Sequence, residues 1–150
     1  MRIEEEIQQR TFKSEYQKAH INIVFTASWL SQHTTRLLKP YGISWQQFNI
    51  LRILRGLAPE PATVKLLTER MLDKMSNASR LVEKLKQKGL VQRKDCPEDR
   101  RRVNVYITEA GLRLVGEASE AIERNMQDQM GSIEEEEARE LNAILDKLRG

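Results

Sequence analysis

Apolar side chains recur every three or four residues along most of the chain, and this spacing predicts a mainly helical protein. Six helices are expected, and their ends are marked where a capping residue, a glycine or a proline interrupts the pattern. The expected helices cover about residues 11–39, 44–56, 63–72, 75–88, 108–130 and 132–148.

Capping residues define several of these helix boundaries. Ser44 and Gln47 have the spacing of a capping box, in which each side chain accepts a hydrogen bond from the backbone of the other residue. Ser132 and Glu135 repeat that spacing before the last helix. Thr108 is expected to cap the long helix that Gly131 ends.

One segment departs from the helical spacing. In Val103–Ile107 apolar and polar residues alternate with the period of a half-buried strand. Leu90–Lys94 is expected to form its partner strand, and Asp95–Arg102 the loop between them. Two helices followed by such a strand pair predict a winged helix-turn-helix. The expected fold class is therefore mainly α with a small β-wing.

The composition fits one soluble, helix-rich domain over residues 1–150, because 39% of the residues are hydrophobic and 31% are charged. No apolar run approaches the roughly 20 residues that cross a membrane, so no membrane partner is expected. The first six residues are too acidic for a secretory signal. The single cysteine, Cys96, rules out an internal disulfide and fits a reducing cytoplasm.

The charge is distributed unevenly along the chain. Residues 1–62 carry a net charge of +3, residues 63–107 carry +6 and residues 108–150 carry −6. The basic excess coincides with the expected winged helix, where neutralising DNA phosphates would require it. The acidic C-terminal segment should therefore face away from DNA. An ordinary uneven surface is the alternative explanation.

The fourth expected helix has a polar face opposite its apolar stripe. Short hydroxyl and amide side chains near its N-terminus could reach base edges, and its cations could reach phosphates or guanine. A merely solvated face would look the same without the wing that follows it. The residues expected to contact DNA in and around this helix are Thr63, Lys65, Ser76, Asn77, Ser79, Arg80 and Lys84.

These two motifs together resemble the MarR family of bacterial transcription regulators. Asp99-x-Arg101, then five residues, then Ile107-Thr108 is similar to the family's wing motif. The run from Ser76 to Leu85, followed by Lys88-Gly89-Leu90-Val91, looks like its recognition helix and exit. The resemblance covers nearly the whole chain, although Asn77 and Ala78 replace the Thr-Val often found there.

The resemblance implies a homodimer that binds double-stranded DNA at a pseudo-palindromic operator, most often as a repressor. Residues of about 44–107 would form the DNA-binding part, and about 1–40 and 108–150 the dimerisation helices. Recognition helices would enter successive major grooves and wings the flanking minor grooves. Asp99 would orient Arg101 by an ion pair. Either Arg100 or Arg101 would then enter the minor groove, with Arg102 beside them.

Many members of the family respond to small aromatic or lipophilic effectors in a cleft between the two parts. The residues expected to form such a site are His20, Trp29, His33, Arg36, Trp45 and Phe48. The alternative is that the aromatic residues belong to the core and the histidines to the surface. Cys96 lies in the wing and is expected to be an incidental thiol.

No catalytic site, metal site or cofactor is expected. The chain has no glycine-rich phosphate loop and no CxxC or HExxH motif, and His20 and His33 have no neighbouring ligand cluster at metal-binding spacing. The remaining alternative to a DNA-binding regulator is a dimeric interaction or small-molecule-binding module that kept the fold. Three adjacent arginines argue against it, because their mutual repulsion brings no benefit without DNA.

Overall fold

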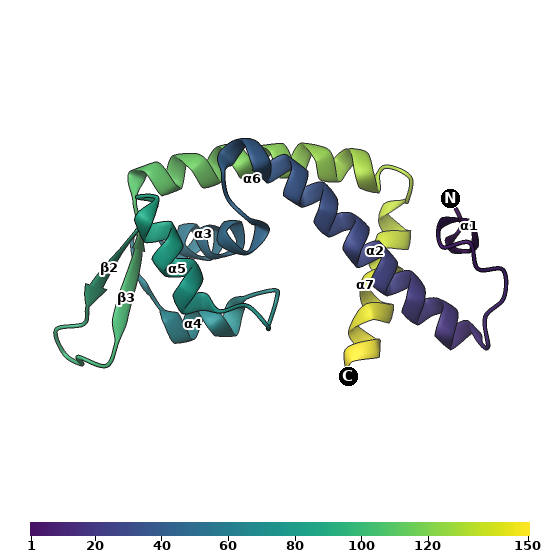
Figure 1. The fold of residues 1–150 in the computed structure, drawn as a ribbon, viewed down its shortest axis with the longest axis horizontal. Helices are drawn as coiled ribbons and strands as arrows, with labels where there is room; N and C mark the ends of the chain where they lie inside the picture. The colour runs from purple at the N-terminus through teal and green to yellow at the C-terminus, as the bar shows by residue number, and fades with distance from the viewer.

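The structure is a computed structural model that describes residues 1–150. Short helices and three strands form a lobe at one end of the molecule, and long helices extend from that lobe (Figure 1). In chain order the elements are α1 (Ile3–Glu6), α2 (Glu15–Leu38), the 3-10 turn η1 (Lys39–Tyr41), α3 (Trp45–Leu57), β1 (Ala62–Thr63), α4 (Val64–Arg70), α5 (Ala78–Gln87), β2 (Val91–Asp95), β3 (Val103–Ile107), α6 (Glu109–Met130) and α7 (Glu135–Arg149).

The six expected helices are all present, and two of their capping residues are confirmed. Ser44 and Gln47 form the expected capping box of α3, and Thr108 caps α6 by accepting the Gly111 N–H at 3.1 Å. The expected box of Ser132 and Glu135 is wrong. Because Ile133 N–H donates to Met130 and prolongs the turn, the last helix starts later.

The residue that caps α7 is Glu134, whose backbone N–H donates to the Glu137 side chain at 2.8 Å. The first long helix also starts later than expected, since Ser14 accepts the Gln17 N–H at 3.1 Å and begins α2 at Glu15. The short α1 was not expected from the sequence. It is held to α2 by an ion pair between Glu4 and Lys18, whose hydrogen bond lowers the pKa of Glu4.

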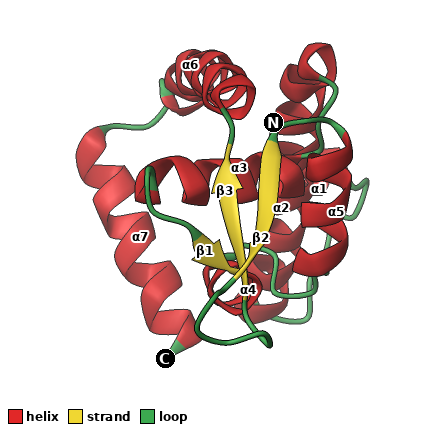
Figure 2. Ribbon diagram, turned by 90° about the vertical axis from the view of Figure 1, so that its left-hand side faces the viewer, coloured by secondary structure: helices red, strands yellow, loops and turns green.

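The three strands form one antiparallel sheet in the order β1-β3-β2. Val91 pairs with Ile107 and Asp95 with Val103, so β2 and β3 form the expected wing hairpin. The additional strand β1 pairs Ala62 with Val105. Two residues are too few to show an alternating pattern, which is why the sequence gives no sign of it. Figure 2 shows the sheet beside the lobe helices, with α6 seen end-on above it.

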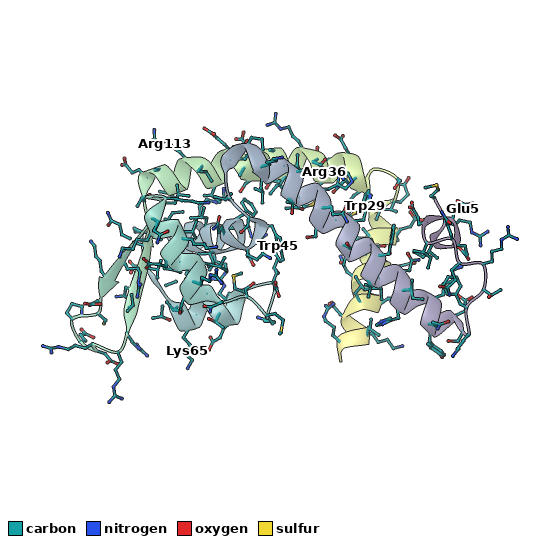
Figure 3. All side chains as sticks on the ribbon, viewed as in Figure 1. Glu5, Trp29, Arg36, Trp45, Lys65 and Arg113 are labelled. Carbon is teal, nitrogen blue, oxygen red and sulfur yellow. The ribbon has the colours of Figure 1, made fainter.

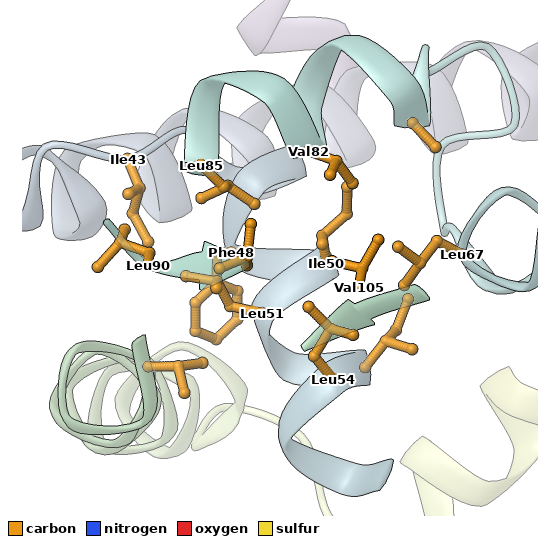
Figure 4. Packing of buried hydrophobic residues seen from close by; sticks show 14 of the residues in the cluster. Ile43, Phe48, Ile50, Leu51, Leu54, Leu67, Val82, Leu85, Leu90 and Val105 are labelled. Carbon is orange, nitrogen blue, oxygen red and sulfur yellow. The ribbon is translucent and has the colours of Figure 1, made fainter. Parts of the chain in front are cut away.

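The hydrophobic core lies in the lobe and is built around α3. Ile50, Leu51 and Leu54 of this helix are fully buried, and they lie between the α5 residues above them and the sheet (Figure 4). From the long helices, α6 contributes Val115 and Ala118. No residue of α7 is buried. The lobe therefore has a core of its own, whereas the outer ends of the long helices do not.

Gly111 allows α6 to begin directly against the exit of α5. A Cβ at this position would lie 2.3 Å from the carbonyl oxygen of Leu90 and 2.8 Å from a side-chain carbon of Ile107. That carbonyl also accepts the Thr108 N–H at 3.1 Å. Only glycine fits this contact, which fixes the long helix relative to the wing.

We expect Gly111→Ala to lower the free energy of unfolding by about 1–3 kcal/mol, because the added methyl group overlaps backbone that cannot move aside. The matched control is Gly116→Ala in the same helix, where nothing lies within 4 Å of an added Cβ. That change should raise stability by about 0.5–1 kcal/mol. Urea denaturation measures both. Equal stability of the two variants would contradict the close approach.

Candidate nucleic-acid interface

The helix expected to contact DNA begins three residues later than the sequence suggested. Asn77 is its N-cap, and its side-chain oxygen accepts the Arg80 N–H at 3.1 Å. The first helical residue is Ala78, which faces the core. One lone pair of the Asn77 oxygen is therefore used by the helix, and its NH₂ group and second lone pair remain to contact a base.

The remaining polar residues of α5 are divided between surface and interior. Ser79, Arg80 and Lys84 are exposed on the face opposite the buried Val82. The Ser76 hydroxyl oxygen is buried without a hydrogen-bond partner. Ser76 is half-buried and precedes the helix, so it does not follow the helical periodicity, and its contact with DNA stays a prediction.

Two further expected residues lie at the start of α4. Thr63 uses its side-chain oxygen to cap this helix, accepting the Leu66 N–H at 3.1 Å. Lys65 is exposed and projects from the lobe on the side opposite Arg113, which lies on α6 (Figure 3). The lobe thus has a cationic face far from the surface that α6 covers.

Asp99 shapes the wing loop through the backbone. Its carboxylate accepts the Arg101 N–H at 2.9 Å, and its carbonyl accepts the Arg102 N–H at 3.0 Å. The loop is closed by Cys96, whose N–H donates to the Arg102 carbonyl at 3.0 Å. The expected ion pair between Asp99 and Arg101 is wrong, because the carboxylate is occupied by the Arg101 backbone.

The three wing arginines are exposed, and none of them forms a salt bridge. Each guanidinium can therefore turn toward an external anion without breaking an internal ion pair. Arginine suits this role because its charge is permanent and its donors lie in a planar fork.

Sequence reasoning missed a second cationic region, between α5 and β2. Arg93 of β2 forms an ion pair with Glu83 of α5 at 3.1 Å and so ties the wing to the helix. Lys86, Arg93 and Lys94 line a polar hollow of about 390 Å³ at this junction. The run Gln92–Asp95 could have indicated this region, because it is polar and follows the apolar Val91. All four of its residues are exposed in the structure.

A separate cavity of about 430 Å³ lies on the other side of the lobe, between α2, α3, α6 and the turn before α5. Of the expected effector residues, Trp45 and Phe48 line it. His20, Trp29, His33 and Arg36 do not. Its walls are formed by Ala27, Leu30, Ser31, Thr34, Trp45, Phe48, Asn49, Arg52, Leu72 and Ile122.

The other candidates lie further out along α2. Trp29 and His33 contact each other edge to face, with ring centroids 4.6 Å apart, and Trp29 lines a second hollow against α1 with Ile3. The cation in the wall of the larger cavity is Arg52, not Arg36. Arg52 could have been found from its helical spacing. It lies three residues after Asn49 and seven after Trp45, which places all three on one face of α3.

The structure contains no group of three or more His, Cys, Asp or Glu residues that could hold a metal ion. Its helices include none with the length and apolar character needed to cross a membrane.

A capped helix beside a cationic two-stranded wing defines a winged helix-turn-helix, a class of proteins that bind DNA. Comparison with known proteins identifies the family. The model of the MarR family matches residues 41–102. The regulator PecS of Dickeya dadantii is 27% identical over 114 residues, covering 75% of this chain and 69% of that protein.

Two further proteins extend the comparison. The HTH-type transcriptional repressor IacR of Pseudomonas putida is 27% identical over 116 residues, covering 77% of this chain and 68% of that protein. The organohalide-sensing regulator RdhR, solved with 2,4-dichlorophenol bound, is 25% identical and superposes with a TM-score of 0.83. That superposition covers 94% of this chain and 85% of RdhR.

Residues 41–102 thus match the MarR family of winged helix-turn-helix transcription regulators, and nearly the whole chain superposes on a regulator of that fold. The comparisons support a DNA-binding transcription regulator.

We expect Asn77→Ala to lower the free energy of unfolding by about 1 kcal/mol, because α5 loses the side chain that caps it. Asn77→Asp should keep the stability, since a carboxylate is an equally good N-cap. Urea denaturation distinguishes the two variants. If the alanine variant is as stable as wild type, the cap contributes nothing and loss of DNA binding by that variant can be assigned to base contact alone.

Proposed function

We propose that this regulator is a homodimeric repressor that acts in the cytoplasm on a pseudo-palindromic operator. In each protomer α5 would enter a major groove and the wing a flanking minor groove. The DNA-binding part would comprise residues of about 44–107, and α2, α6 and α7 would dimerise. The similarity to the repressor IacR supports the direction of regulation.

The observation that carries this proposal is the position of the unpaired cations. Arg80 and Lys84 on α5 and the three wing arginines are all exposed, and none of them is in a salt bridge. They occupy the segment with net charge +6, whereas residues 108–150, with net charge −6, form α6 and α7. A module that did not bind DNA would gain nothing from this separation of charge.

We expect Arg100→Ala and Arg101→Ala each to weaken binding to a duplex that the wild-type protein selects from a random library. Each lost phosphate contact should reduce the slope of log K against log salt by about 0.9. Arg113→Ala is the matched control, because it removes the same charge from the opposite side of the lobe. The measurement is fluorescence anisotropy at several salt concentrations. If both wing variants bind DNA with the affinity and salt slope of the Arg113→Ala control, then the wing does not contact DNA.

Dimerisation is supported by the apolar side chains that the single chain leaves exposed. Ile144 and Leu148 of α7 are 64% and 66% exposed, and the helix extends from α6 without touching the lobe core (Figure 1). Large contiguous apolar patches are unusual on monomers. Two-fold symmetry would also match the symmetry of a palindromic operator. Further exposed apolar residues of the long helices are Ile23, Val24, Met126, Met130 and Leu141.

We expect Ile144→Glu to shift the protein from dimer to monomer at micromolar concentration, because the charge would be buried between two copies of α7. Asn142→Glu is the control, since it adds the same charge on the opposite face of the helix. Light scattering measures the mass. A wild-type protein that is monomeric under these conditions would overturn the proposed dimer.

We also propose that the cavity beside α3 binds a small aromatic acid or phenol. Trp45, Phe48 and Ile122 supply apolar walls, and Arg52 supplies a fork of donors for an anionic oxygen. The relative RdhR was solved with 2,4-dichlorophenol, which supports this ligand class. Binding would change the distance between the two recognition helices, which must be about 34 Å to meet successive major grooves.

We expect 2,4-dichlorophenol to quench the fluorescence of Trp45 and to weaken DNA binding. Trp29→Phe removes the other tryptophan, so that the signal in this variant comes from the cavity alone. At pH 6, where salicylate is ionised and the phenol is neutral, Arg52→Leu should weaken the binding of salicylate more than that of the phenol, because only salicylate then forms an ion pair with Arg52. No quenching by either compound at millimolar concentration would remove the effector proposal.

A further inference from the structure

Asn49 is a polar residue in the most buried part of the molecule. Its side chain is 2% exposed and lies on α3 between the core residues Phe48 and Ile50. The side-chain oxygen accepts the backbone N–H of Leu72 at 2.9 Å. The side-chain nitrogen makes no hydrogen bond. A buried amide donor without a partner is costly, so this group is incomplete as the structure stands.

The hydrogen bond to Leu72 joins α3 to the turn that leads into α5. Leu72 is the second residue after α4, and the turn beyond it has hydrogen bonds of its own. Asp73 accepts the N–H groups of Met75 and Ser76 at 3.0 and 3.1 Å, and Asn77 then caps α5. A displacement of Leu72 would therefore be passed along an ordered turn to the first residue of the recognition helix.

Both partners of this hydrogen bond also line the cavity. Leu72 is 66% exposed, so its side chain is not held in the core. Among the residues that line the cavity, Asn49 alone has a buried polar atom without a hydrogen bond. A ligand oxygen could supply the missing acceptor if the amide moved toward the cavity.

We propose that Asn49 transmits occupancy of the cavity to the recognition helix. The oxygen and nitrogen of an amide belong to one rigid plane, so a ligand that draws the nitrogen toward itself also moves the oxygen away from the Leu72 N–H. The turn is then released and α5 loses its position. This inference rests on the proposed effector function of the cavity, and it adds the residue and the direction of coupling.

The coupling follows from differential affinity. A ligand changes DNA binding only if it binds the released turn more tightly than the held turn, and coupling of this kind is typically about 5–150-fold. The ligand must carry an oxygen acceptor beside an apolar ring, since Asn49 provides a donor and Trp45 and Phe48 provide apolar surface.

Two substitutions of Asn49 test its acceptor and its donor separately. Asn49→Asp keeps the acceptor for Leu72 but lacks the donor, so DNA binding should stay within about threefold of wild type and should not respond to ligand. Asn49→Leu lacks both groups, so DNA binding should be weaker by about tenfold without any ligand. Gln46→Glu is the control, because it adds the same charge on α3 outside the cavity.

The experiment measures DNA affinity by anisotropy with and without saturating 2,4-dichlorophenol, at pH 7, 8 and 9, because burial raises the pKa of a carboxyl group and only its ionised form lacks a donor. Amide hydrogen exchange of Leu72 is followed by NMR in the same samples. In wild type the phenol should weaken DNA binding by about fivefold or more and speed exchange at Leu72. Exchange at Leu66 should not change, because its N–H donates to Thr63 and neither residue lines the cavity.

The outcomes separate the two proposals. If wild type and Asn49→Asp respond equally to the phenol, the transmitting role of Asn49 is overturned while the effector site stands. If Asn49→Leu binds DNA like wild type and its Leu72 amide exchanges no faster, then the hydrogen bond from Leu72 to Asn49 does not position the turn before α5. If the wild-type protein binds the phenol without any change in DNA affinity, the effector proposal fails, and the transmission fails with it.

Discussion

The burial of α3 is the constraint on which the rest of the lobe depends. Its residues Gln47–Leu51 are buried without interruption, so this helix is covered on nearly every side in its first half. The elements that cover it are α2, α4, α5, α6 and β3. The recognition helix, the wing and the long helices are therefore positioned by one central helix, and a change at its surface reaches all of them.

This arrangement explains why the lobe has a buried hydrophobic core and the outer parts of the long helices do not. The core of 18 buried residues lies around the lobe and includes Leu38 of α2 and Val115 and Ala118 of α6, whereas α7 buries none of its side chains. A DNA-reading lobe has to keep its shape against the duplex, and a closed core provides that rigidity. The long helices leave apolar residues exposed. In the proposed homodimer a second copy would cover them, and the interface between copies would then set the distance between the two lobes.

The sequence predicted the local elements well and the three-dimensional contacts less well. Helical spacing, the Ser44 cap and the alternation of Val103–Ile107 are properties of neighbouring residues, so a pattern reveals them. Which cation lines the cavity depends on how α2 and α3 cross, and no sequence periodicity records that. The sequence therefore indicated Arg36, whereas Arg52 lines the cavity. Asp99 was misassigned for a related reason, because its backbone partners are visible only once the loop is folded.

Asn49 is the residue through which we propose that the cavity acts on the recognition helix. An apolar residue at this position would pack in the core without leaving an amide nitrogen unsatisfied, and a buried polar group is normally retained only where it is fully hydrogen-bonded. Here the amide oxygen accepts the Leu72 N–H in the turn before the recognition helix, and the amide nitrogen has no hydrogen-bond partner. This asymmetry suits the proposed switch. A ligand that accepts a hydrogen bond from the unpaired nitrogen would be stabilised by that bond. The accompanying movement would break the hydrogen bond to Leu72 and so couple ligand binding to the DNA-binding surface.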